Sequence, residues 1–216
     1  MKFDHDNISP LDSRYANKIS ELRENFSESA LIKIRFNIEI EWLLYICVNL
    51  PKTFKPLSKQ SIKKIAKFKD SFDNKSILKI KKIESITNHD VKAVEYYIRD
   101  QFLKDKVLST YTHLIHFGLT SEDINSLSYA HMIKNGISIY IMKLDKVNKI
   151  LKNYSKKWAK QPFLARTHGQ AASPSTLGKE FKVFHERINR EIQHLKSIKP
   201  LAKFSGATGN YHTFDI

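Results

Sequence analysis

The stretch between Pro56 and Gly118 contains neither glycine nor proline, the two residues that most often interrupt helices and strands. Each of them occurs only six times in the 216 residues, well below its usual share. Within the stretch, apolar residues recur at helical spacing with lysines between them. The gap is long enough for several helices, and it predicts a mainly helical chain.

Periodicity and capping residues extend this prediction along the chain. Thr87 with Asp90, and Thr120 with Asp123, each resemble a helix-capping pair, and Gly136 is a weak point of the helix that follows Thr120. No segment alternates in polarity as a half-buried strand does, so the fold class is predicted to be all-α. The expected helices cover residues 27–50, 58–72, 75–86, 91–103, 120–160 and 175–198, with a short turn or helix over 111–117 and a loop over 161–173.

Composition excludes several classes of protein. Hydrophobic residues make up 41% of the chain, enough for a sizeable core and too many for global disorder. The single cysteine, Cys47, excludes an internal disulfide framework. No stretch approaches 18 uncharged apolar residues, and the N-terminus has no apolar signal region. We therefore expect a soluble cytoplasmic protein that does not bind or span a membrane.

The formal net charge of +15 raises the possibility of nucleic-acid binding. Of the 37 basic residues, however, 7 are Arg and 30 are Lys, whereas arginine is preferred for bidentate phosphate and base contacts. The densest stretch, Lys52 to Lys82, holds 11 lysines interleaved with apolar residues, as on a solvated helix face. A basic surface without a nucleic-acid partner is the favoured interpretation.

Two polar clusters stand at predicted helix starts. Helix N-termini present unpaired N–H groups and the positive end of the helix dipole, so they suit carboxylates and phosphates. Ordinary capping is the alternative explanation for either cluster. The clusters are Thr87-Asn88-His89-Asp90 and Thr120-Ser121-Glu122-Asp123.

Two further candidates lie outside the helices. His168, within Arg166-Thr167-His168-Gly169-Gln170, could transfer a proton near neutral pH, or it could be a surface or capping histidine. Arg14 and Tyr15 could hold a phosphate through guanidinium and phenol donors, or they could anchor an N-terminal arm. The sequence has no P-loop and no dinucleotide-binding glycine motif.

Taken together in order, these segments resemble the adenylosuccinate lyases, a family within the fumarase/aspartase superfamily. Thr-Ser-Glu-Asp and Thr-Asn-His-Asp are similar to the adenylosuccinate branch rather than to argininosuccinate lyase or fumarase. The resemblance covers essentially the whole chain, as the N-terminal portion of such an enzyme. The matching segments are Ser9–Tyr15, Thr87–Tyr96, His116–Asn125, Arg166–Gln170 with Pro174–Glu180, and Gly206–Tyr211.

The resemblance implies β-elimination of fumarate from adenylosuccinate, giving AMP, and from the succinyl-carboxamide ribonucleotide of purine synthesis (SAICAR to AICAR). It implies that His168 is the general acid and that Thr120 and Ser121 hold a substrate carboxylate. Arg14 and Tyr15 would bind the phosphate. Asn88, His89 and Asp90 would line the same pocket. The resemblance implies no metal and no organic cofactor.

The family's base is a serine in a mobile Gly-Ser-Ser-x-Met-Pro loop, and this sequence contains no such loop. The resemblance also implies a homotetramer with a central helical bundle built from several subunits. We therefore expect an N-terminal helical domain over residues 1–110 and an incomplete bundle domain over 111–216. The 216-residue chain is expected to be inactive by itself.

Three other functions stay open at this point. The chain could be another fumarate-releasing lyase of the superfamily, which a panel of substrates would identify. It could be a basic helical nucleic-acid-binding protein, which would bind a duplex with a steep salt dependence. It could also be a non-catalytic helical assembly fragment, which would bind no nucleotide.

Overall fold

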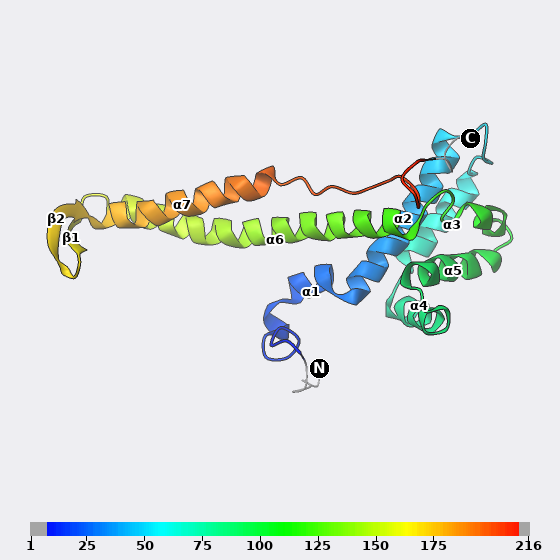
Figure 1. Cartoon of the computed structure of the whole chain (residues 1–216), viewed down its shortest axis with the longest axis horizontal. Helices are drawn as coiled ribbons and strands as arrows, with labels where there is room; N and C mark the ends of the chain where they lie inside the picture. The colour runs from blue at the N-terminus through cyan, green and yellow to red at the C-terminus, as the bar shows by residue number, and fades with distance from the viewer. Residues whose placement is uncertain (1–7, 212–216) are drawn as a thin grey trace. The chain divides into compact units, whose positions relative to one another are not determined.

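The computed structural model describes residues 8–211, and within that range the regular secondary structure is helical apart from one hairpin (Figure 1). The predicted all-α class is thus confirmed, with this small sheet as the exception. Between residues 8 and 211, no helix is both long enough and apolar enough to cross a membrane. The elements are η1 (Ala16–Lys18), α1 (Ser20–Phe26), α2 (Glu28–Asn49), α3 (Lys59–Asp70), α4 (Asn74–Thr87), α5 (Asp90–Leu103), η2 (Leu108–Leu114), α6 (Ser121–Lys157), β1 (Pro162–Thr167), β2 (Gln170–Thr176) and α7 (Leu177–Ser197), where η marks 3₁₀ helices.

The chain divides into two compact units. The described part of the first comprises residues 8–133 and 200–211, and the second comprises residues 134–199. Helix α6 begins in the first unit and ends in the second. The division into a domain over 1–110 and a bundle domain over 111–216 stays a prediction.

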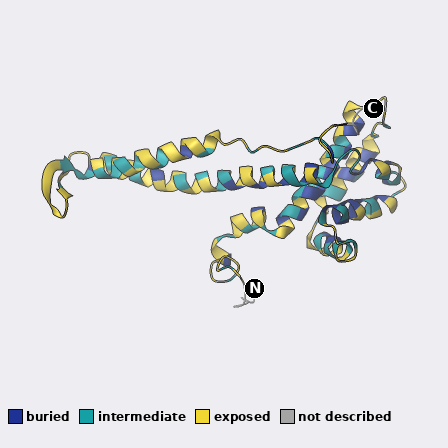
Figure 2. Ribbon diagram, in the orientation of Figure 1, coloured by how far each residue is buried: buried dark blue, intermediate teal, exposed yellow. Residues whose placement is uncertain are grey.

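Helix α2 carries the core of the first unit. Phe36 and Leu43 are fully buried on it, and the Phe36 ring stacks on Phe72 with centroids 4.2 Å apart. Tyr97 and Ile98 of α5 belong to the same core, and the buried residues gather where α2 to α5 meet (Figure 2). Complete burial of a side chain as large as Phe36 contributes roughly 1.5–3 kcal/mol, so this cluster is the main stabilising feature of the unit.

Capping residues set most helix starts in the first unit. Ser27 accepts a hydrogen bond from the Ala30 N–H at 3.2 Å, and Asp73 with Ser76 forms a capping box at α4. The predicted cap Thr87 is wrong: its hydroxyl donates back to the Ile83 carbonyl within α4, and His89 caps α5 instead. Thr87 is the last residue of α4, and the left-handed Asn88 turns the chain between it and α5.

The lysine-rich stretch is a solvated face, as predicted. On α3, Ile65 is 1% exposed, while Lys59, Lys63 and Lys67 are exposed. The apolar side faces the core and the lysines face solvent, which is the arrangement of an ordinary amphipathic surface helix.

The second unit is a helical hairpin closed by the strands. Helix α6 continues through Gly136 without a break in its helical assignment, and α7 packs on its last part, where the Phe181 and Tyr154 rings lie 5.3 Å apart. The predicted loop over 161–173 is wrong, because β1 and β2 pair there as antiparallel strands. Both strands are almost wholly exposed, so they lack the alternation of polarity that would have revealed them.

Candidate active site

The turn from α4 to α5 brings His89 to the start of α6. Asn88 has a φ of 51°, a left-handed conformation that asparagine tolerates, and it ends α4. The His89 Nδ1 then accepts the Lys92 N–H at 3.2 Å. Since Nδ1 is the acceptor, the neutral ring carries its proton on Nε2. That Nε2 lies 3.4 Å from the Ser121 hydroxyl, so the structure unites two residues that the sequence assigned to one pocket.

The carboxylate of Asp90, the residue after His89, pairs with the buried Arg35. Arg35 of α2 is 4% exposed, and its Nη2 lies 2.7 Å from Oδ2 of Asp90. Its Nε donates to Oδ1 of Asn125 in α6 at 2.9 Å. Burial acts to raise the pKa of Asp90, but the Val91 N–H and the Arg35 guanidinium outweigh it and hold the pKa below its usual range. One side chain thereby ties α2, α5 and α6 together.

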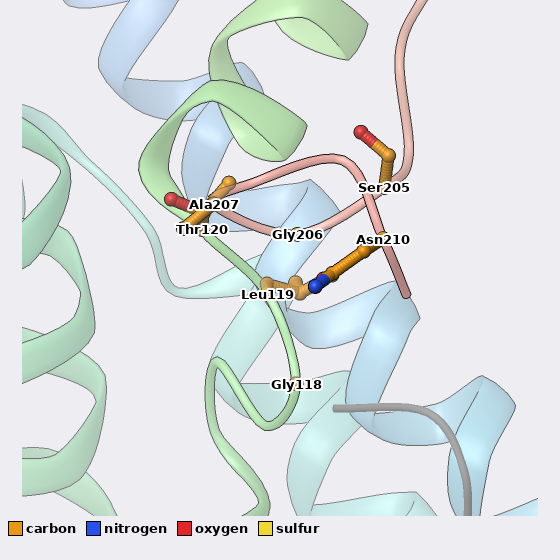
Figure 3. A pocket seen from close by; sticks show the side chains of 7 residues that line it. All are labelled: Gly118, Leu119, Thr120, Ser205, Gly206, Ala207 and Asn210. Carbon is orange, nitrogen blue, oxygen red and sulfur yellow. The ribbon is translucent and has the colours of Figure 1, made fainter. Parts of the chain in front are cut away.

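Thr120 lines a small pocket just before the start of α6, where Ser121 is the first helical residue. Residues 118–120 line one side and residues 205–207 with Asn210 the other, and the side chain of Asn210 is directed toward Leu119 (Figure 3). The cavity measures about 130 Å³. A space of this size accommodates a group as small as a carboxylate.

Asp123 joins the two walls of this pocket. Its carboxylate is 1% exposed and accepts the Thr120 N–H at 2.8 Å and the Ser205 N–H at 3.0 Å. The Lys203 ammonium donates to it at 2.6 Å. Burial acts to raise the pKa of Asp123, but these donors outweigh it and the pKa is lowered. The predicted Thr120–Asp123 capping pair is present in this one direction, from backbone to side chain.

Arg14 and Tyr15 lie in the turn before η1. The Arg14 guanidinium stands over the Tyr15 ring, 5.4 Å from its centroid, and both side chains are exposed. The neighbouring Arg23 anchors this segment by donating to the Leu11 carbonyl at 3.1 Å. Within residues 8–211, the structure shows no contact of Arg14 with the His89–Ser121 pair.

His168 occupies the tip of the β1–β2 hairpin in the second unit. Thr167 pairs with Gln170, so His168 and Gly169 form a two-residue turn, with φ values of 50° and 76°. Positive φ at both positions is typical of the type I′ turn, which matches the twist of hairpin strands. The His168 side chain is exposed, and Arg166 donates to the Gly169 carbonyl at 3.2 Å across the turn.

Three residues of this site were absent from the sequence-based assignment. The sequence predicts Asp123 only as a capping residue and assigns no role to Arg35 or Lys203. Asp123 lies with Asn125 in the segment His116–Asn125, and the resemblance of this segment to the family was a signal that could have identified it. No sequence signal distinguishes Lys203 from the 29 other lysines of the chain.

Comparison with known proteins places these features in a family. A family model described as "Lyase" matches residues 13–216. The adenylosuccinate lyase of Buchnera aphidicola (subsp. Schizaphis graminum) is 41% identical over 208 residues, which are 95% of this chain and 45% of that protein. The adenylosuccinate lyase of Escherichia coli K12 is 37% identical over 207 residues, with the same two coverages. The chain therefore spans about half the length of the relatives it matches.

Solved structures match the fold. The fumarate lyase of Mesorhizobium sp. BNC1 superposes with a TM-score of 0.72 at 20% identity, over 91% of this chain and 44% of that one. The β-carboxy-cis,cis-muconate cycloisomerase of Acinetobacter calcoaceticus gives a TM-score of 0.69 at 18% identity, over 94% and 47%. At this level of identity the likeness concerns the fold alone, and it confirms the predicted fumarase/aspartase-like architecture.

Proposed function

Since the chain belongs to the lyase family whose model spans residues 13–216, we propose that it supplies the acid and the substrate-binding groups of an adenylosuccinate lyase. The observation that carries the proposal is the approach of His89 to Ser121 from separate elements, 32 residues apart in sequence. The resemblance had assigned both to one substrate pocket. Relatives that carry this name at 37–41% identity support it.

The reaction is an elimination in which adenylosuccinate gives AMP and fumarate. A base takes a proton from the carbon beside one carboxylate, and the electrons of that C–H bond form the double bond of fumarate. The C–N bond breaks, and the leaving nitrogen receives a proton from an acid. We propose His168 as this acid, because an imidazole exchanges protons near neutral pH and this side chain is exposed at a turn. SAICAR, which undergoes the same elimination, is the second proposed substrate.

The binding roles follow the chemistry of each position. Thr120 and Ser121 would bind a succinyl carboxylate, supported by the dipole of the 37-residue helix α6 and by the pocket that Thr120 lines. Asn88, His89 and Asp90 would line the nearby substrate surface, with the Nε2–H of His89 as a donor. Arg14 and Tyr15 would hold the phosphate, supported by an exposed guanidinium.

We also propose that the active assembly is a homotetramer in the cytoplasm. Large apolar side chains of the second unit are half-exposed, among them Tyr140 at 55%, Ile150 at 54% and Phe184 at 55%. Faces of this kind are usual where helices pack against other subunits. The buried thiol of Cys47 is compatible with a reducing compartment.

Calorimetric titration of the purified chain with adenylosuccinate and AMP tests the proposal. We expect saturable binding of both ligands that weakens about tenfold in Arg14→Ala, because a charge-assisted phosphate contact is lost. Lys18→Ala is the matched control, since the Lys18 ammonium lies 5.7 Å from the centroid of the same Tyr15 ring. Equal losses in the two variants would remove Arg14 from the phosphate site.

Other outcomes identify the alternatives. Absence of adenylosuccinate binding, together with saturable binding of argininosuccinate, would indicate a different lyase of the superfamily. Duplex DNA binding with a steep salt dependence and no nucleotide binding would indicate a nucleic-acid-binding protein. The chain alone is proposed to release no fumarate, and an absorbance increase from fumarate would overturn that expectation.

A further inference from the structure

We propose that Asp123 is a positioning residue that fixes the glycine-rich segment 205–210 against the start of α6 and so forms the carboxylate pocket. This inference rests on the proposed function for the identity of the ligand. Asp123 lines no part of the cavity itself. It acts through the backbone groups of both walls and through Lys203.

The contacts of Asp123 span the two walls. Oδ2 accepts the Thr120 N–H at 2.8 Å on the α6 side, and Oδ1 accepts the Ser205 N–H at 3.0 Å on the opposite side. The carboxylate is 1% exposed, so water cannot replace these donors without opening the structure. Because a buried carboxylate is strongly disfavoured without partners, Asp123 keeps the backbones of Thr120 and Ser205 at a fixed distance from each other.

Lys203 completes the connection. Its ammonium donates to Asp123 at 2.6 Å and to the Gly206 carbonyl at 2.8 Å. The Lys203 N–H donates to the Ser126 hydroxyl at 3.1 Å, one helical turn further along α6. The lysine therefore fixes both the entry of the segment and the buried Gly206, whose φ of 71° turns the chain back toward Thr120.

Trp42 of α2 restrains the same two segments from the apolar side. Its indole N–H donates to the Phe117 carbonyl at 2.8 Å, and its ring lies 5.2 Å from the Phe204 ring. The residue preceding Gly118 and the residue preceding Ser205 thus contact one side chain. Since this apolar contact holds the segment's entry, loss of Asp123 is expected to loosen residues 205–210 without detaching the segment.

The direction in which adenylosuccinate affinity changes distinguishes a positioning role of Asp123 from a purely electrostatic one. Removal of the Asp123 charge would by itself favour an anionic ligand nearby. Positioning predicts the opposite, because a loosened wall no longer presents its groups to the carboxylate. It also predicts selectivity: adenylosuccinate carries the succinyl carboxylates and AMP does not, so the loss should affect adenylosuccinate alone.

The test compares the 216-residue chain with its Asp123→Asn variant by amide hydrogen exchange and by calorimetry. We expect exchange of residues 204–211 to accelerate about tenfold or more in Asp123→Asn, with residues 91–102 of the core unchanged. Adenylosuccinate affinity should fall about tenfold while AMP affinity stays within about twofold. Glu122→Gln, which removes an exposed charge from the same helix turn, is the matched control and should resemble the wild type.

Lys203→Met tests the partnership. It should accelerate amide exchange in residues 204–211. In the Asp123→Asn/Lys203→Met double variant these amides should exchange no faster than in the faster-exchanging single variant, because the two residues act as one unit. Wild-type exchange in Asp123→Asn, or tighter adenylosuccinate binding, would overturn the positioning role. If the wild-type chain binds no adenylosuccinate although the exchange difference is present, the proposed function fails and the structural role of Asp123 stands.

Discussion

The Nδ1 atom of His116 lies 2.6 Å from Oε1 of Glu39, a carboxylate with no exposed surface. The two residues come from the segment after η2 and from α2, 77 positions apart. Burial acts to lower the pKa of His116, but the hydrogen bond and charge of Glu39, with a further contribution from Glu95, outweigh burial and the repulsion from Lys92. The pKa of His116 is therefore raised, because Glu39 favours the charged imidazolium.

This pair should make stability fall as pH rises from neutral. A histidine whose folded pKa is raised contributes fully below its unfolded pKa of about 6.5, and the contribution is lost as pH rises through the folded value. His116→Asn keeps a residue that tolerates the φ of 61° but leaves Glu39 buried without its partner. We expect a loss of about 3–5 kcal/mol at pH 6, shrinking at higher pH. Urea denaturation from pH 5.5 to 9 measures it.

His113→Asn is the matched control for that experiment. His113 lies in η2, three residues before His116, and is exposed, so its removal should leave the pH dependence as in the wild type. Glu39→Gln should flatten the same part of the curve, because the imidazolium then lacks its counter-charge. A pH profile unchanged in both His116→Asn and Glu39→Gln would contradict the assignment.

Arg35→Met should destabilise the first unit by about 2 kcal/mol, because the contacts of the buried guanidinium with Asp90 and Asn125 are both lost. Asp90, whose lowered pKa depends on Arg35, contributes stability above its unfolded pKa that is lost as pH falls. The stability difference between variant and wild type should therefore narrow in acid. Lys33→Met, an exposed change on the same helix, should change the free energy of unfolding by about 0.5 kcal/mol or less. A similar loss in both variants would exclude a specific role for Arg35.

Local chemistry explains how much of the fold could be predicted. Ser27 and Ser58 precede apolar periodic stretches, and both cap the helices that were expected there. The hairpin at residues 162–176 was missed, because its exposed strands have no apolar face and only the turn at His168 and Gly169 specifies them. A two-residue turn flanked by polar residues is a weak signal in a chain of helices.

The site was predictable where its residues are neighbours in sequence. Asn88, His89 and Asp90 form one cluster, and Thr120 and Ser121 another, so the pattern of polar residues at helix starts was enough to select them. The ion pair between Asp123 and Lys203 joins positions 80 residues apart. Nothing local distinguishes such a lysine from a solvated one, since only the packing of the glycine-rich segment onto α6 brings the two together.

Gly169→Ala should destabilise the second unit by about 1–2 kcal/mol. An added Cβ meets no atom within 4 Å there, so the cause is not crowding but the φ of 76°. Gly169→Asn should lose less, because asparagine tolerates the left-handed region better than alanine. Circular dichroism during urea unfolding compares the two variants. Equal stability of Gly169→Ala and the wild type would mean that the turn relaxes to another type at no cost.

Gly178→Ala should destabilise the second unit although it replaces glycine within a helix. Helix propensity alone would favour alanine by about 1 kcal/mol. A Cβ at Gly178, however, would lie 2.5 Å from the Ser155 carbonyl oxygen and 2.6 Å from the Ala159 backbone. These are backbone atoms of the end of α6 and the turn after it, and the Gly178 N–H also donates to the Trp158 carbonyl at 2.9 Å. The two segments cannot move apart without losing the hydrogen bond between Gly178 and Trp158.

We expect the steric crowding to outweigh the gain in helix propensity, so that Gly178→Ala lowers the free energy of unfolding by about 1–3 kcal/mol. The Trp158 ring, which packs 5.2 Å from Phe181, provides a fluorescence signal for unfolding in this unit. Lys182→Ala is the control for helix propensity, because this exposed residue lies one turn further along α7 and should change stability little. A Gly178→Ala variant more stable than the wild type would show that α7 can shift away from α6, and the close approach at Gly178 would then not determine how the two helices pack.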